Sequence, residues 1–572
     1  MAEAGAIRPS RPLTLSSRAT HISPTEWRWV VLVALGVLAL TSLPYLVGWA
    51  ASTPERLFGG FVFAVEDGHS YLAKMRLGAR GDWLFHDVYT AEPHEGGLFF
   101  PFHLLLGKLA ALAGWSLILT YHLARLAFGF ILLLVTYRFI AAFASLRRVR
   151  RLAFLLVALS GGLGWLLVAL GATNWLNSPP LDVYLPEGYT FLAVFGFPHL
   201  AAARSLLLGG LLFLLRAFER GQARFALAAG VAWLAMGLIV PFYVVIAGVV
   251  VITYLIARRL PPPPSPQARG ERWGNREGVR ASWPLAALAG LVAAPIVLYS
   301  LIAFSTNPVF RAWSQQNLIL SPHPLHYVLG YLVPGLLAVP GARMAWRKVG
   351  HGRLLVAWVV IAPLLVYIPF NLQRRLIEGF QVPLSLLAAY GFYFGLAPVL
   401  RRRTEDGGRR IKGGVSSVFR PPPAVAQAAL LLFSVLTPLM LAFGGTMAAL
   451  ARSEPIFHSA SEVAALDWLD AHAPPDALVL SAYETGNYLP TQADVRAFLG
   501  LGPETVDLPR KRALVAEFYR SGKPDVLWAY GVHYVIAGPR ERALGSFDLD
   551  AAPFLERVYT NDDYTIYRVV AD

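Results

Sequence analysis

Long apolar segments separated by short polar loops recur along the first 450 residues of the chain. A helix that crosses the hydrocarbon core of a bilayer needs about 20 predominantly apolar residues in a row, and these segments approach or reach that length. The pattern therefore predicts a polytopic α-helical membrane protein with about 11 transmembrane helices. The predicted spans are residues 29–50, 116–143, 152–171, 203–217, 225–240, 242–257, 283–304, 326–341, 354–371, 380–400 and 424–449.

Arginine and lysine gather in alternate loops between these spans, within residues 147–151, 216–224, 258–280, 343–353 and 401–420. Because basic residues are enriched in cytoplasmic loops, we expect a cytoplasmic N-terminal tail (residues 1–28) and an extracytoplasmic C-terminus, in the cell (inner) membrane. A cleaved signal peptide is the alternative for the first span. Its 22 residues are long for a signal peptide, which favours a retained helix.

The segment at residues 97–114, "GLFFPFHLLLGKLAALAG", admits two interpretations. It is apolar enough to cross the membrane, but counting it as a span would invert the order of the loops that follow. A helix that lies in the outer interface of the membrane fits its His103, its Lys108 and the acidic loop before it. We therefore assign residues 29–450 to one transmembrane domain whose long outer loop, residues 51–115, carries interfacial helices.

The sequence changes character at about residue 451. From there to the C-terminus 18 acidic residues outnumber 11 basic ones, and helical and strand patterns alternate. Residues 459–474 and 509–522 have helical patterns, residues 476–481 and 533–538 have strand patterns, and residues 554–570 are typical of a hairpin that turns at Asn561–Asp563. We expect an extracytoplasmic α/β domain over residues 451–572.

Charge and cysteine content exclude some classes of partner and of site chemistry. The net charge of +15 would suit a nucleic-acid-binding protein. However, the positive residues lie in short loops between apolar segments, so we expect membrane lipids and no nucleic acid as partners. The chain has no cysteine, which excludes disulfides and thiolate chemistry.

An acidic pair follows the first span, in the stretch "FAVEDGHSYLAKMRLGARGDW" at residues 63–83. An ionisable group at the membrane face is costly unless it is paired or solvated in a cavity, so Glu66 and Asp67 are functional candidates. A solvated loop acid without a catalytic role is the alternative.

The same stretch resembles the first outer loop of the GT-C superfamily of membrane glycosyltransferases, in the branch of protein O-mannosyltransferases and lipid A aminoarabinose transferases. The matching positions are Asp67, Tyr71 and either Gly78 or Gly81. Two features depart from the family pattern. Glu66 precedes Asp67 where the family often has a second acid after it, and His94 replaces a basic residue before a segment that lacks the family's proline pair.

The resemblance implies an inverting glycosyltransferase that moves a hexose or pentose from a polyprenyl-phosphate carrier to an acceptor hydroxyl at the outer membrane face. Asp67 would be the catalytic base, with Glu66 in the same role or positioning the site. The acceptor is a protein, a lipid or a glycan. A transporter or flippase of polyprenyl lipids or glycans, and a non-enzymatic envelope assembly protein, are the alternative functions, although no matched repeat favours transport.

Other polar residues of the outer loops are candidates for substrate binding. Arg374 and Arg375 lie outside, against the charge rule, and so suggest contact with a carrier phosphate; an ion pair between Arg374 and Glu378 is the alternative. Asp67, Asp182 and Glu187 have the oxygen ligands that Mg²⁺ or Mn²⁺ prefers, although no tight spacing supports a metal site. The predicted substrate-binding residues are Tyr71, His94, Asp182, Glu187, His199, Arg204, Arg374 and Arg375.

Overall fold

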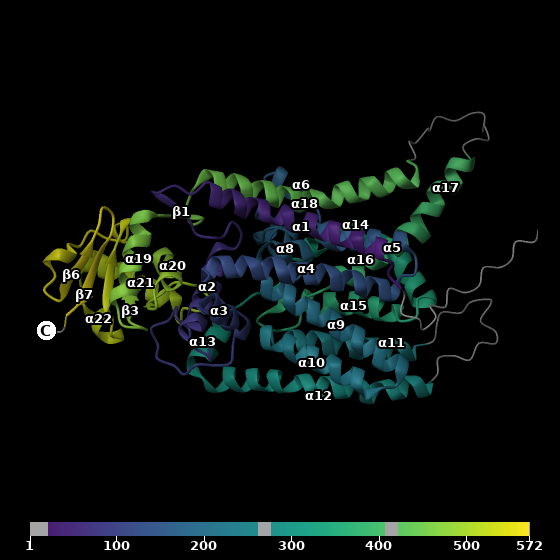
Figure 1. The fold of residues 1–572 in the computed structure, drawn as a ribbon, viewed down its shortest axis with the longest axis horizontal. Helices are drawn as coiled ribbons and strands as arrows, with labels where there is room; N and C mark the ends of the chain where they lie inside the picture. The colour runs from purple at the N-terminus through teal and green to yellow at the C-terminus, as the bar shows by residue number, and fades with distance from the viewer. Residues whose placement is uncertain (1–20, 261–275, 407–420, 571–572) are drawn as a thin grey trace, which may run out of the picture.

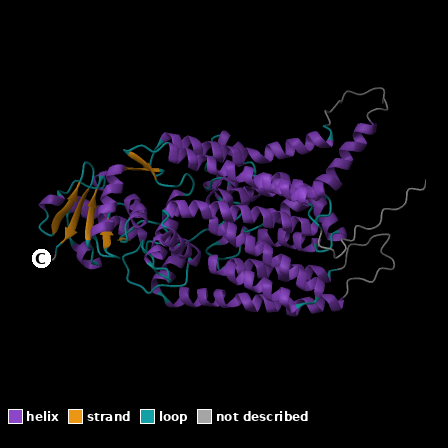
Figure 2. Ribbon diagram, viewed as in Figure 1, coloured by secondary structure: helices purple, strands orange, loops and turns teal. Residues whose placement is uncertain are grey.

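A computed structural model describes residues 21–260, 276–406 and 421–570 of the chain. A long bundle of helices forms most of the molecule, and a small α/β unit sits at one end of it (Figures 1 and 2). Most of the predicted cytoplasmic tail and parts of the two basic loops at 258–280 and 401–420 lie outside the described residues.

The bundle confirms a polytopic α-helical membrane protein. Within the described residues, eight helical stretches are long and apolar enough to cross a membrane. The predicted spans at 225–240, 242–257 and 354–371 correspond to shorter helices, α10, α11 and α15. The helices of the bundle are α1 (Pro24–Ala50), α4 (Leu117–Phe143), α5 (Arg147–Leu159), α6 (Gly164–Ala169), α9 (Pro198–Arg220), α10 (Ala223–Ile239), α11 (Tyr243–Arg259), α12 (Arg276–Thr306), α14 (Pro324–Lys348), α15 (Gly352–Leu365), α16 (Gln381–Gly391), α17 (Ala397–Asp406) and α18 (Pro423–Ala451).

The predicted span at 152–171 is interrupted between α5 and α6. Here the backbone passes so close to α14 that a Cβ on Gly162 would collide with the carbonyl of Gly330. The amides of Gly162 and Gly164, freed by the break, donate to the carboxylate of Asp182 at 2.7 and 3.1 Å. Side-chain capping of this kind satisfies backbone donors that a continuous helix would satisfy itself.

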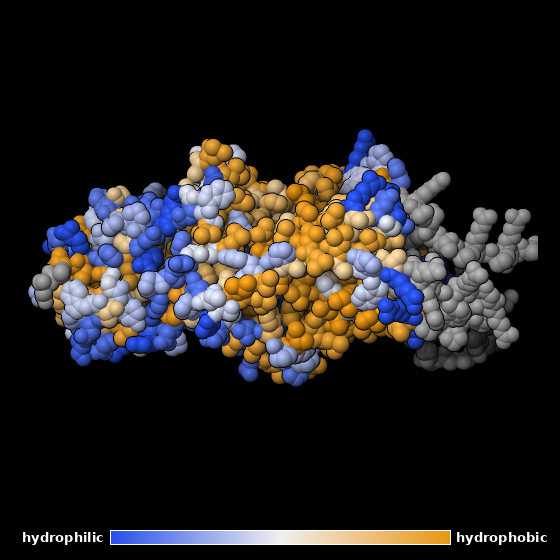
Figure 3. Space-filling view, turned by 90° about the horizontal axis from the view of Figure 1, so that it is seen from below, coloured by the Kyte–Doolittle hydropathy of each residue, from blue (hydrophilic) through white to orange (hydrophobic). Residues whose placement is uncertain are grey.

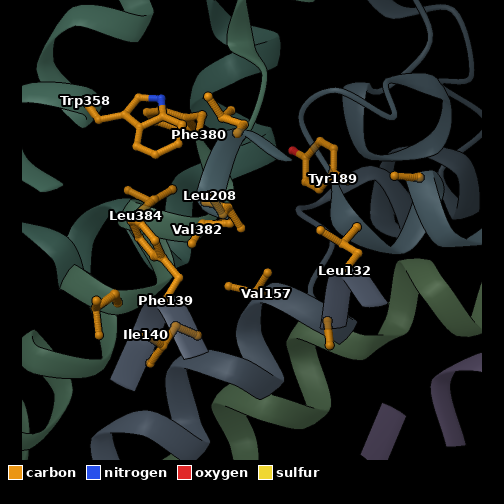
Figure 4. Close-up of a cluster of buried hydrophobic side chains, with 14 of the residues drawn as sticks. Leu132, Phe139, Ile140, Val157, Tyr189, Leu208, Trp358, Phe380, Val382 and Leu384 are labelled. Atoms are coloured by element: carbon orange, nitrogen blue, oxygen red, sulfur yellow. The ribbon is translucent and has the colours of Figure 1, made fainter. Parts of the chain in front are cut away.

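The core of the bundle is apolar and draws on helices far apart in the sequence (Figure 4). Leu132 and Phe139 of α4 meet Val157 of α5, Leu208 of α9 and Leu384 of α16. The outward faces of the helices carry many exposed leucine, valine and isoleucine side chains. Figure 3 shows the resulting apolar band between two polar ends of the molecule.

The first outer loop lies between the bundle and the C-terminal unit (Figure 1). It contains β1 (Arg56–Phe58), α2 (Val65–Arg80) and α3 (Pro101–Ala113). The 13 residues of α3 would be about 20 Å long, short of the bilayer's hydrocarbon thickness of about 30 Å. Gly107 allows α3 to lie directly on α2, since a Cβ there would collide with the carbonyl of Met75. The interfacial position of residues 97–114 stays a prediction.

The C-terminal unit is a five-stranded sheet with helices packed around it. The strand order is β4-β3-β5-β7-β6, in which β3 runs parallel to β4 and β5, and β7 runs antiparallel to β5 and β6. The predicted hairpin is confirmed, and Asn561 caps its turn by accepting from the amides of Asp563 and Tyr564. The strands are β3 (Leu478–Leu480), β4 (Arg496–Ala497), β5 (Tyr534–Ala537), β6 (Leu555–Thr560) and β7 (Thr565–Val569), and the helices are α19 (Ala460–His472), α20 (Tyr483–Gln492), α21 (Leu508–Ser521), α22 (Asp525–Tyr530) and α23 (Pro539–Arg542).

Two further connections join this unit to the membrane part. Strand β2 (Phe457–Ser459) pairs antiparallel with β1 of the first outer loop. Helix α13 (Pro308–Gln316), between α12 and α14, donates from the Gln316 side chain to the carbonyls of Pro503 and Thr505. The sheet unit is thus fastened to two outer loops at the end of the bundle opposite α17 (Figure 1).

Candidate active site

Helix α2 carries the acidic pair, Glu66 and Asp67, in its first turn. The helix starts after Ala64, whose left-handed backbone (φ 49°, ψ 54°) turns the chain sharply. Glu66 and Asp67 lie in the first turn, where unpaired amides and the helix dipole favour negative charge. Asp67, Tyr71 and Lys74 are spaced i, i+4 and i+7, so they share one face of the helix.

Asp67 is accessible to solvent, and the charges of Arg375, Arg374 and Glu187 act on it. Burial raises the pKa of Asp67 above its usual value, while the charges of Arg375 and Lys74 lower it in part. The carboxylate therefore has the accessibility and the raised pKa expected of a general base.

The charges of Arg374 and Arg375 both act on Asp67. Both arginines are in the 3₁₀ turn η2 (Gln373–Ile377). Arg375 pairs with Glu187 at 3.4 Å but keeps 40% of its side chain exposed. Burial alone would lower the pKa of Arg375, but the carboxylates of Glu187 and Asp67 raise it, so it stays a cation. Arg374 lies over the ring of Tyr184 at 4.8 Å and its charge also reaches Asp67.

Arg204 does not face a ligand, because its guanidinium bonds to Glu378 and to the loop that carries Glu187. It is buried and pairs with Glu378, donating to it from Nη2 at 2.9 Å. The same nitrogen donates to the carbonyls of Pro186 and Glu187 at 2.8 Å. Glu378 thus pairs with Arg204, not with Arg374, and Arg204 fixes the backbone of the residue that holds Arg375.

Asp182 and His94 also have other partners. Asp182, in α7 (Leu181–Tyr184), accepts from Thr437 at 2.7 Å in addition to the two glycine amides of the α5–α6 break. His94 accepts from the amide of Asp87 at 2.9 Å and contacts the carbonyl of Glu92 through its other ring nitrogen. Both side chains hold loops together, and the structure does not bring either of them to Asp67.

A metal site built from Asp67, Asp182 and Glu187 does not fit this geometry. Asp182 is committed to backbone amides, and Glu187 is paired with Arg375. Within the described part of the chain, no three histidine, aspartate or glutamate side chains converge in a way that could hold a metal ion.

Tyr71 and His199 come together with a third residue, His103 of α3. Tyr71 stacks on His103 with ring centroids 4.7 Å apart, and His199 lies 4.8 Å from Tyr71 and 4.9 Å from His103. Sequence analysis placed His103 in the interfacial helix without a role. Only the packing of α3 on α2 reveals its proximity to Tyr71.

The C-terminal unit contributes two side chains that contact α2, the helix that carries the acidic pair. Lys74 pairs with Glu504 at 2.8 Å, and both side chains are buried. Tyr483 of α20 contacts Glu66 at 3.3 Å. More than 400 residues separate the partners in each pair, so no local sequence signal could have found them.

An apolar groove lies between α14, α15 and α16, with a volume of 530 Å³. Its lining runs along α14 from Pro324 to Ala342 and reaches Ile377, the last residue of η2. Arg374, in the same turn, interacts electrostatically with Tyr327 of the groove wall. The arginine pair therefore lies between the head of the groove and Asp67.

Comparisons with known proteins support the fold. No protein-family model and no curated protein sequence matches the chain. The oligosaccharyltransferase AglB of Archaeoglobus fulgidus, solved with an inhibitory peptide and a dolichol-phosphate, is similar in structure, with a TM-score of 0.53 and 14% identity over 90% of this chain and 70% of AglB. The mycobacterial arabinofuranosyltransferase AftD gives a TM-score of 0.51 with 17% identity, over 95% of this chain and 42% of AftD. ArnT of Cupriavidus metallidurans bound to undecaprenyl phosphate gives a TM-score of 0.47 with 15% identity, over 96% of this chain and 99% of ArnT.

AglB and AftD are GT-C glycosyltransferases. The chain therefore has the GT-C fold, as the resemblance of the first outer loop predicted. Its helical membrane part and its small C-terminal sheet unit are both established. Because identity is low throughout, the likeness defines the fold, and activity has to be argued from the site.

Proposed function

We propose that the protein is an inverting glycosyltransferase that transfers a sugar from a polyprenyl-phosphate carrier to an acceptor hydroxyl at the outer face of the cell membrane. The observation that supports this best is the order of three features: an apolar groove in the membrane part, two arginines at its head, and the accessible carboxylate of Asp67 beyond them. A lipid tail, a phosphate and an attacking hydroxyl would need these features in the same order.

The groove suits an isoprenoid tail. Its lining is almost entirely apolar, and Leu336, Val339 and Val360 are exposed beside it on the lipid-facing surface. The stretch of α14 that it follows is about 27 Å long, close to the hydrocarbon thickness of a bilayer. A protein of this fold has been solved with a dolichol-phosphate.

The arginine pair suits the phosphate of such a carrier. Arginine is matched to phosphate oxygens by its fixed fork of N–H donors. Arg375 is already balanced by Glu187, whereas Arg374 contacts the face of Tyr184. The guanidinium of Arg374 is thus available to stabilise the negative charge that develops on the phosphate as it leaves.

The reaction then follows from the position of Asp67. The oxygen of the acceptor hydroxyl attacks the anomeric carbon, the bond from that carbon to the phosphate oxygen breaks, and the phosphate leaves with the electron pair. Asp67 takes the hydroxyl proton, a step that contributes roughly 10²–10⁴-fold in other enzymes. A single displacement of this kind inverts the anomeric centre. Glu66, bonded to Tyr483, would position the acceptor between α2 and the C-terminal unit.

The proposal can be tested with purified protein in liposomes that contain synthetic polyprenyl-phosphoryl hexoses and pentoses. Cell-envelope extract supplies the acceptor, and the measurement is release of free polyprenyl phosphate. We expect release from at least one donor, and a loss of about tenfold or more when Arg374 and Arg375 are both changed to glutamine. Arg520→Gln, at an exposed site of the C-terminal unit, is the matched control. No release by the wild-type protein, or equal release by the double variant, would refute the proposal.

A further inference from the structure

We propose that His103 and His199, together with Tyr71, bind hydroxyl groups of the donor sugar. The inference rests on the proposed glycosyl transfer and adds to it the side chains that hold the sugar. The three residues come from three elements, α2, α3 and the start of α9, which meet beside Asp67.

The first line of support is the unsatisfied polar atoms of the two histidines. His103 is 1% exposed and His199 is 9% exposed. Both ring nitrogens of His103 and Nδ1 of His199 are buried and have no hydrogen-bond partner among the described residues. Buried polar groups are nearly always hydrogen-bonded in folded proteins, so such a concentration at one place indicates a missing ligand.

The position of the cluster is the second line of support. Tyr71 is one helical turn after Asp67 on the same face of α2. The charges of Asp67, Arg375 and Glu187 all act on Tyr71, and Arg375 and Lys74 act on His199. The cluster therefore lies beside the place where the carbon–phosphate oxygen bond would break, which is where the donor sugar has to sit.

The chemistry of the groups favours sugar hydroxyls over phosphate. A neutral imidazole has one N–H donor and one nitrogen acceptor, which matches a hydroxyl that both donates and accepts. Burial lowers the pKa of His103 well below its usual value, and His199 and Lys74 lower it further, so His103 is neutral.

The test compares the affinities of purified protein in nanodiscs for two kinds of probe, farnesyl phosphate without a sugar and a panel of farnesyl-phosphoryl hexoses and pentoses. For the wild-type protein we expect at least one sugar to improve binding about tenfold over farnesyl phosphate, the gain of one or two good hydrogen bonds.

Two variants then locate the sugar contact. His199→Leu and His103→Phe should each abolish most of the gain from the sugar and leave the affinity for farnesyl phosphate unchanged, which also shows that the variants are folded. His472→Phe, at an exposed histidine of the C-terminal unit, should keep the full gain.

Each other result counts against a defined part of the proposal. If both variants keep the gain, the histidines are packing residues and the inference fails. If they weaken farnesyl phosphate as much as its glycosides, the cluster binds phosphate and the inference also fails. If the wild-type protein binds none of the probes, the proposed function itself fails, and the inference fails with it.

Discussion

Asp67 is accessible to solvent, yet desolvation by the protein around it raises its pKa. An acid with a raised pKa is a stronger base once it is deprotonated, which suits removal of a hydroxyl proton. The nearby Arg375 limits the rise, because a cation favours the charged form of the carboxylate.

The pH dependence of transfer should report this balance. Asp67 has to be deprotonated to act as a base, so kcat/KM should fall as the pH drops through its raised pKa, which lies above the ordinary aspartate value of about 3.9. Arg375→Gln removes a cation and leaves Glu187 unpaired, and both changes raise the pKa of Asp67 further. The acid limb of the pH profile should therefore move to higher pH. An unchanged limb in Arg375→Gln, with Arg520→Gln as control, would show that Asp67 is not the titrating base.

At this scale the sequence predicts part of the site. The acidic pair after the first span stands out because ionisable groups at the membrane face are costly. The arginine pair stands out because it opposes the rule that basic residues lie in cytoplasmic loops. Arg204 and Asp182 show the same chemical character but have structural partners, Glu378 and the amides of Gly162 and Gly164. Residue type and predicted side of the membrane cannot separate these cases, because the partner is chosen by tertiary packing.

Helix α2 is the element on which the proposed site depends. One face carries Asp67, Tyr71 and Lys74, and the basic residues of the helix pair with acids of the C-terminal unit. Lys74 pairs with Glu504, Arg76 with Asp470 and Asp494, and Arg80 with Asp476. The C-terminal unit thus fixes the helix that carries the proposed base.

The buried pair of Lys74 and Glu504 offers a test of this connection. Breaking a buried ion pair by removing one partner costs about 3–5 kcal/mol, because the other charge is left without compensation. Lys74→Met and Glu504→Leu should each lower the unfolding temperature of the purified protein, whereas the double variant should recover much of the loss. The exposed pair of Lys523 and Glu517 provides control variants with little effect. Additive losses in the double variant would show that the two side chains do not act as a pair.

The groove beside α14 can be tested through a glycine in its wall. Gly335 lines the groove, and a Cβ there would meet no atom within 4 Å. Gly335→Leu should therefore fold normally but obstruct the groove, and we expect it to weaken farnesyl phosphate binding about tenfold or more. Gly290→Leu in α12, where a Cβ likewise meets nothing within 4 Å, is the matched control. Equal binding by both variants would place the tail elsewhere.

For the molecule as a whole, hydrophobic pattern and charge were sufficient to predict the architecture. Runs of apolar residues have to become helices in a bilayer, because only then are their backbone groups satisfied. The places where the predicted membrane helices are interrupted or followed by short helices are harder to predict. The interruption after α5 depends on the approach of Gly330 and on Asp182, and the small α13 depends on contacts with the C-terminal unit.

The orientation in the membrane follows from the basic loops and stays a prediction. The ends of α5, α11 and α17 that carry them lie opposite the C-terminal unit (Figure 1). Because the chain has no cysteine, single cysteines can report sidedness without background. In intact cells, Lys523→Cys should react with a membrane-impermeant maleimide, and Lys348→Cys should react only after the cells are opened. The reverse pattern would place Asp67 on the cytoplasmic side, where the proposed reaction has no role.

The central claim is that Asp67 accepts the proton of the attacking hydroxyl, and Asp67→Asn tests it most directly because it keeps the shape of the side chain and removes the base. The measurement is the rate of polyprenyl phosphate release from a glycosylated donor, with farnesyl phosphate affinity measured in parallel and Asp467→Asn, an exposed acid of α19, as control. We predict that Asp67→Asn loses about 10²–10⁴-fold in rate and binds farnesyl phosphate as well as the wild type does. Transfer at the wild-type rate by Asp67→Asn would contradict the account.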